Sequence, residues 1–105
     1  MITVTFFKSG NVLIGFEVCG HSDYSEEGSD IVCAAVSSAV YMAANTITDV
    51  QHICAEVTAD DGFMSLKLSE SGAVKARDVI LGLQLHLNAL TEQYNKYIKV
   101  KNSEV

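Results

Sequence analysis

Positively charged side chains are scarce in this sequence. The chain has 7 Lys and Arg residues against 13 Asp and Glu residues, which gives a formal net charge of −6 at neutral pH. Since phosphate binding needs clusters of Lys and Arg, this composition disfavours direct contact with nucleic acid. The charge suits a basic protein as partner instead, because complementary fields attract at long range.

The chain also lacks the features of secreted and membrane proteins. Its 3 cysteines are an odd number, which argues against a disulfide framework and fits a reducing compartment. No apolar run approaches the ~20 residues that a membrane-spanning helix needs. No basic region followed by an apolar stretch marks a targeting segment at the start. We therefore expect a cytoplasmic protein that does not associate with membranes.

Length and composition predict one folded unit. The chain has 105 residues, of which 49% are hydrophobic, enough for one continuous core. Neither a linker nor a low-complexity tract interrupts it. We expect a single domain over residues 1–105.

Alternation of apolar and polar residues predicts two β-hairpins. Ile2–Phe7 and Val12–Cys19 alternate with the period of half-buried strands, and turn residues join them. A second pair, His52–Ala59 and Phe63–Leu68, flanks an Asp-Gly turn, which is a strong short-range hairpin signal.

Two segments have helical patterns. From Asp30 to about Thr48, apolar residues surround the helical wheel, which predicts a buried central helix capped by Ser29 or Asp30. After the second hairpin, apolar residues recur at spacings of four and three. This recurrence predicts one long amphipathic helix, packed on the sheet and starting near Ser71 or Ala73.

The predicted fold class is therefore α+β, in the order ββαββα. Ile98–Val100 could add a short final strand before a polar tail.

His21 and Cys33 are the residues with the clearest catalytic chemistry. His21 ends the second strand, and Cys33 falls in the first turn of the predicted central helix. There the positive end of the helix dipole would stabilise a thiolate, and free backbone amides, that of Cys33 included, would bind an oxyanion. An imidazole nearby would take the thiol proton and later protonate a leaving amine. This arrangement predicts a cysteine peptidase.

Further residues could support this pair. Asp30 is a candidate for orienting the imidazole of His21, although helix capping competes for its carboxylate. Ser37 lies one turn beyond Cys33 on the same helical face and could line the site. The acidic segment Ser22–Ser29 has the composition of a solvated loop that could close over a peptide.

The spacing of the Cys and His residues along the sequence leaves two other interpretations open. Free cysteine is among the most buried residue types, so Cys33 could be an inert core residue. Zinc could be bound by cysteine and histidine ligands, yet the spacing of a zinc knuckle is missing. The residues concerned are Cys19, His21, Cys33, His52 and Cys54. We expect no metal and no other cofactor.

The central motif nevertheless resembles a known family. Gly20-His21, then Gly28, then the run from Asp30 to Ser37 (DIVCAAVS) look like the signature of the ribosomal-processing cysteine protease family, Prp. The resemblance extends over nearly the whole chain. Two departures, Ser22 in place of a common alanine and Asn95 in place of a common proline, leave the proposed dyad untouched.

The resemblance implies more than the residues alone. Family members are homodimeric α+β proteins that remove a short N-terminal extension from the twenty-seventh large-subunit ribosomal protein. By resemblance, His21 and Cys33 match the catalytic dyad and Gly28 matches a hinge in the loop. Asp30 and Ser37 match residues near the site. The alternative from another functional class is a non-catalytic binding module associated with the ribosome.

Overall fold

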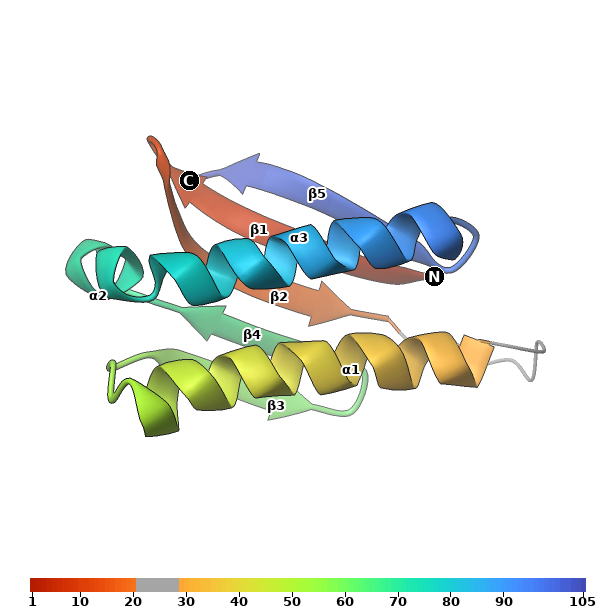
Figure 1. The fold of residues 1–105 in the computed structure, drawn as a ribbon, viewed down its shortest axis with the longest axis horizontal. Coiled ribbons are helices and arrows are strands. Elements are labelled where there is room, and N and C mark those ends of the chain that lie inside the picture. The colour runs from red at the N-terminus through yellow and green to blue at the C-terminus, as the bar shows by residue number, and fades with distance from the viewer. Residues whose placement is uncertain (21–28) are drawn as a thin grey trace.

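The computed structural model describes residues 1–20 and 29–105. Its strands form one sheet of five strands in the order β3-β4-β2-β1-β5 (Figure 1). Neighbouring strands are antiparallel except for β1 and β5, which are parallel. The strands are β1 (Ile2–Ser9), β2 (Val12–Cys19), β3 (Glu56–Asp60), β4 (Phe63–Lys67) and β5 (Ile98–Glu104).

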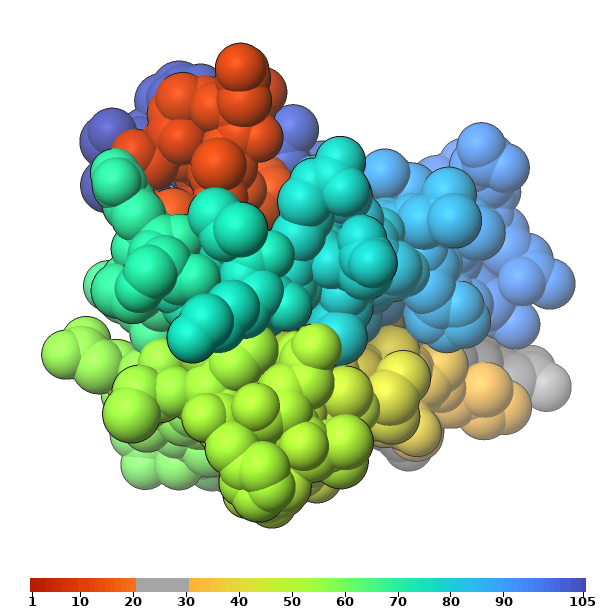
Figure 2. All heavy atoms as spheres, turned by 60° about the vertical axis from the view of Figure 1, so that its left-hand side comes forward, coloured from red at the N-terminus to blue at the C-terminus, as the bar shows by residue number. Residues whose placement is uncertain are grey.

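The helices lie on one face of this sheet. Figure 1 shows α1 and α3 running side by side across it, and Figure 2 shows their side chains in contact. The helical segments are α1 (Ser29–Asn45), the π-helix η1 (Thr46–Val50), α2 (Glu70–Lys75) and α3 (Arg77–Gln93). The α+β class predicted from the sequence is confirmed.

The core lies between the sheet and the helices. In β1 the alternate residues Ile2, Val4 and Phe6 are buried, as their period-two pattern predicts. The ring of Phe6 packs against that of Phe16 on β2, with centroids 6.2 Å apart. From the helices, α1 contributes Val32, Val36 and Val40, and α3 contributes Ile80, Leu83 and Leu87.

Helix α1 is buried on one face only. Ile31 and Met42 are 68% and 64% exposed, so the prediction of a helix buried all round is wrong for this outer face. Residues Ile31–Val50 are long and apolar enough to cross a membrane by length and composition, contrary to the prediction of no such run. The core helix of a soluble protein meets the same criterion, and here the valine face packs on the sheet.

The second helical segment divides where the sequence predicted one helix. Ser69 caps α2, since its hydroxyl accepts a hydrogen bond of 3.1 Å from the amide of Gly72. At Ala76 the backbone leaves helical geometry (φ −92°, ψ 4°), and α3 begins at the next residue. The stripe of apolar residues continues across the break, which is why the pattern alone did not reveal it.

Two strand boundaries also differ from the prediction. His52 has a positive φ of 55° and does not belong to a strand, so β3 begins only at Glu56. The C-terminal segment is a full strand, β5, which pairs with β1 from Ile98 to Glu104 rather than forming a polar tail.

Candidate active site

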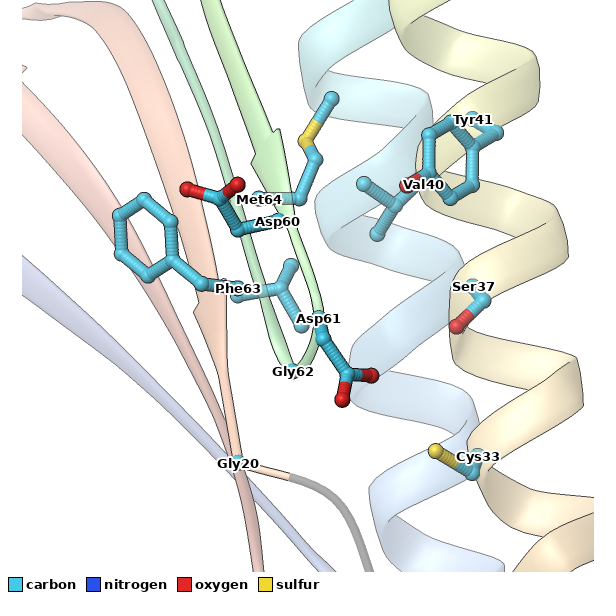
Figure 3. Close-up of a pocket in the computed structure, with 11 residues that line it drawn as sticks. Gly20, Cys33, Ser37, Val40, Tyr41, Asp60, Asp61, Gly62, Phe63 and Met64 are labelled. Atoms are coloured by element: carbon cyan, nitrogen blue, oxygen red, sulfur yellow. The ribbon is translucent and has the colours of Figure 1, made fainter.

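Cys33 and Ser37 line a cavity between α1 and the tip of the β3–β4 hairpin. The cavity has a volume of about 200 Å³. Figure 3 shows the Sγ of Cys33 and the Oγ of Ser37 directed from α1 toward the hairpin. The other lining residues are Val18, Gly20, Val40, Tyr41, Asp60, Asp61, Gly62, Phe63 and Met64. The cavity thus combines a half-buried thiol with apolar walls and the carboxylate of Asp61.

Gly20 fixes the end of β2 at this cavity. Its amide donates a hydrogen bond of 3.0 Å to the carbonyl oxygen of Gly62 in the hairpin turn. Its φ of +90° is readily adopted by glycine, and a Cβ here would collide with the carbonyl oxygen of Met1. Only glycine therefore fits this position without strain, and the chain leaves β2 for residue 21 from the wall of the cavity.

The position of Cys33 on α1 differs from the prediction. Because α1 begins at Ser29, Cys33 is its fifth residue and lies in the second helical turn. At that position the amide bonds to the carbonyl of the first helical residue, so the amide of Cys33 is not a free oxyanion donor. The helix dipole also weakens beyond the first turn. Stabilisation of a Cys33 thiolate thus depends mainly on a neighbouring cationic group.

The structure brings together only part of the predicted site. Cys33 and Ser37 share the cavity. His21 and Gly28 lie outside the described residues. The backbone of Asp30 belongs to α1, so Asp30 lies within the helix rather than before it, and its side chain is not described.

Sequence reasoning missed Tyr41 on α1 and all the residues of the opposite wall of the cavity. Tyr41 lies four residues beyond Ser37, so helical spacing from Cys33 could have revealed it. Asp61 and Met64 reach the cavity only because the β3–β4 hairpin folds toward α1. No local pattern indicates which residues a distant hairpin will face.

The remaining candidate ligands do not form a metal site. Among residues 1–20 and the part of the chain after the undescribed segment, no three His, Cys, Asp or Glu side chains come close enough to hold a metal ion. Cys19 pairs with Phe63 in the sheet, whereas Cys54 is exposed and precedes β3.

A larger cavity, of about 740 Å³, lies between α1 and α3 and is mostly apolar. Its lining includes Ser38, Met42 and His86, but no cysteine. We therefore place the candidate chemistry in the smaller cavity.

Sequence comparison decides the family. A model of the family described as cysteine protease Prp matches residues 1–99. The chain belongs to the cysteine protease Prp family. It is 27% identical over 107 residues to the ribosomal processing cysteine protease Prp of Bacillus subtilis (strain 168), covering 95% of this chain and 96% of that protein. The Prp protein of Staphylococcus aureus (strain Mu50) is 26% identical and covers 77% of this chain and 78% of its own length.

Solved structures share the fold of this chain. The SMU.848 protein of Streptococcus mutans has a TM-score of 0.87 at 26% identity, covering 100% of this chain and 96% of that chain. The essential ribosomal processing protease Prp from S. aureus, solved in complex with a substrate peptide, has a TM-score of 0.89 at 24% identity. That match covers 98% of this chain and all of the S. aureus chain, and at this identity it shows a shared fold.

Proposed function

We propose that this chain is a cysteine endopeptidase that removes the short N-terminal extension of the twenty-seventh large-subunit ribosomal protein during ribosome maturation. The observation that carries the proposal is the half-buried thiol of Cys33, directed into a cavity in a chain that belongs to the cysteine protease Prp family. The relatives from B. subtilis and S. aureus bear the name ribosomal processing cysteine protease. Such processing would take place in the cytoplasm.

Cys33 is the proposed nucleophile and His21 the proposed base. His21 would accept the thiol proton, and the thiolate would attack the scissile carbonyl carbon. As the tetrahedral intermediate collapses, the carbon–nitrogen bond breaks and the imidazolium protonates the leaving amine. Water would then hydrolyse the thioester, releasing the N-terminal extension and restoring the thiol.

The placement of Gly20 supports this pairing. Gly20 lines the Cys33 cavity and is held to the hairpin turn by its hydrogen bond to Gly62. His21 is the next residue in the chain, so the backbone before the imidazole is fixed at the wall of the cavity. The second-turn position of Cys33 makes an imidazolium partner more important, because the helix dipole alone contributes less there.

Supporting roles are proposed for three further residues. Ser37 would contact the peptide from the wall that it shares with Cys33. Asp30 would lie near the dyad, and Gly28 would act as a hinge for the acidic loop.

We also propose that the chain works as a homodimer. Met42 on α1 and Leu85 on α3 are large apolar side chains that are 64% and 74% exposed, and association with a second copy would remove such surface from water. Sedimentation at micromolar concentration checks this point. We expect twice the monomer mass, and a monomer at every concentration would contradict the proposal.

The experiment that tests the function uses the precursor ribosomal protein and mass spectrometry. Wild-type chain should release one short N-terminal peptide, whereas Cys33→Ala and His21→Ala should leave the precursor intact. The released mass also identifies the cleaved bond. Intact precursor with the folded, reduced wild type would contradict the proposal and favour a peptidase with another substrate or the ribosome-associated binding module.

A further inference from the structure

Asp61 faces Cys33 across the candidate cavity. Figure 3 shows its carboxylate in the space between the hairpin turn and α1, whereas the carboxylate of Asp60 points to the other side of the sheet, beside Phe63. The turn itself does not require a negative charge. Gly62 supplies the positive φ, at 74°, and asparagine serves as well as aspartate before glycine in such turns. The charge of Asp61 is therefore not explained by the hairpin.

The carboxylate of Asp61 has no cationic partner in the described structure. The only ion pair between described side chains that lies within 4.0 Å joins Arg77 and Asp78, and no described Lys or Arg lines the cavity. In the sequence, residues 21–28 contain no Lys or Arg, and His21, their one side chain that can become cationic, is the base proposed for the Cys33 thiol. They contain Asp23, Glu26 and Glu27 instead. The cavity thus lies in a locally negative part of the chain.

A carboxylate without a cationic partner, such as that of Asp61, would disfavour attack by the Cys33 thiol. A thiolate and an oxyanion both develop during thiol attack, and a nearby negative charge raises the free energy of each. A positive charge brought by the substrate would offset that cost. The cation would then be needed for catalysis as well as for binding.

We propose that Asp61 is a specificity residue, which binds a Lys or Arg side chain of the substrate close to the scissile bond. This inference rests on the proposed function, in which a peptide is cleaved at Cys33. An ammonium or guanidinium group can pair with one carboxylate, whereas a metal ion needs several ligands. The apolar side of the cavity, with Val40 and Met64, would contact the methylene stem of such a residue.

The test is cleavage of a random decapeptide library, with the cut positions read by mass spectrometry. Peptides cut by the wild type should be enriched about fivefold in Lys or Arg at one position near the scissile bond. A preference of this size is what the free energy of one exposed ion pair would produce. Asp61→Asn keeps the turn and should lose this enrichment. Asp61→Lys should invert it, so that Asp or Glu is enriched at the same position.

Asp49→Lys is the matched control, because Asp49 is an exposed aspartate in η1, at the opposite end of α1 from Cys33. It changes the net charge of the protein by the same amount as Asp61→Lys and should retain the wild-type preference for Lys or Arg. The inference is overturned if the wild type shows no cationic preference, or if Asp61→Asn and Asp61→Lys retain it.

The library separates this inference from the proposed function. Cleavage of the ribosomal precursor without cationic preference in the library would overturn the role of Asp61 alone. Cleavage of library peptides but not of the precursor would overturn the proposed substrate alone. If neither is cleaved, both proposals are wrong.

Discussion

The amide of Gly20 lies 3.0 Å from the carbonyl oxygen of Gly62 and donates a hydrogen bond to it. This bond joins the end of β2 to the hairpin turn that faces Cys33 across the cavity. Residues far apart in the sequence are thereby held around one small space. The position of the proposed base depends on this junction, since His21 follows Gly20 directly.

Substitution of Gly20 tests the junction. Gly20→Ala places a Cβ against the carbonyl oxygen of Met1 at a positive φ, so we expect the free energy of unfolding to fall by about 1–3 kcal/mol. We also expect peptidase activity per folded molecule to fall, because the backbone before His21 must shift. Urea denaturation measures the first effect, and the initial rate of precursor cleavage measures the second.

Gly82→Ala is the control for that substitution. Gly82 lies within α3, and a Cβ there meets nothing within 4 Å. Alanine should therefore raise the free energy of unfolding by about 0.5–1 kcal/mol without changing the cleavage rate. If Gly20→Ala were as stable and active as Gly82→Ala, the junction would have no role in the site.

Ser37 and Ser38 distinguish the two cavities. Both are exposed residues of α1, but Ser37 lines the Cys33 cavity and Ser38 lines the cavity between α1 and α3. Ser37→Leu should lower kcat/KM about tenfold, because its side chain would occupy space needed by the peptide. Ser38→Leu should leave it unchanged, and neither should alter stability by more than about 0.5 kcal/mol.

Steady-state kinetics with one peptide substrate compare the two variants. If Ser38→Leu lost activity while Ser37→Leu kept wild-type activity, the peptide would bind in the cavity between α1 and α3 instead.

Reactivity toward iodoacetamide tests activation of the thiol. Exposure alone would make Cys54 react first, because it is exposed while Cys19 and Cys33 are partly buried. If a cationic group stabilises the Cys33 thiolate, Cys33 should react about tenfold faster than Cys54 at neutral pH. Peptide mapping after short labelling times gives the three rates. Fastest labelling at Cys54 would favour the non-catalytic binding module.

Local patterns predicted most of the fold. The alternation in β1 and β2 and the Asp-Gly turn before Phe63 identified both hairpins. The strand β5 was underestimated because only Ile98 is fully buried along it, and much of its order comes from pairing with β1. A hydrogen bond of 2.9 Å from Gln84 on α3 to Asn102 adds to this order. Long-range pairing of this kind leaves little trace in local hydrophobicity.

The candidate site was predictable only on the helix. Ser37 follows Cys33 at helical spacing, so the sequence predicts that they share a face, and both line the cavity. Asp61 and Phe63 belong to a hairpin whose approach to α1 is a property of the whole sheet. The prediction of a free amide at Cys33 was wrong because helix α1 starts at Ser29 and not after Asp30.

The most direct test of the account is covalent capture by a peptide chloromethyl ketone that carries the sequence before the cleaved bond. Intact mass and tandem mass spectrometry would locate the adduct in the wild type and in Cys33→Ala. The account predicts one peptide per chain, attached to Cys33, and none attached to Cys33→Ala. An adduct on Cys19 or Cys54, or equal capture by Cys33→Ala, would contradict the assignment of Cys33 as the nucleophile.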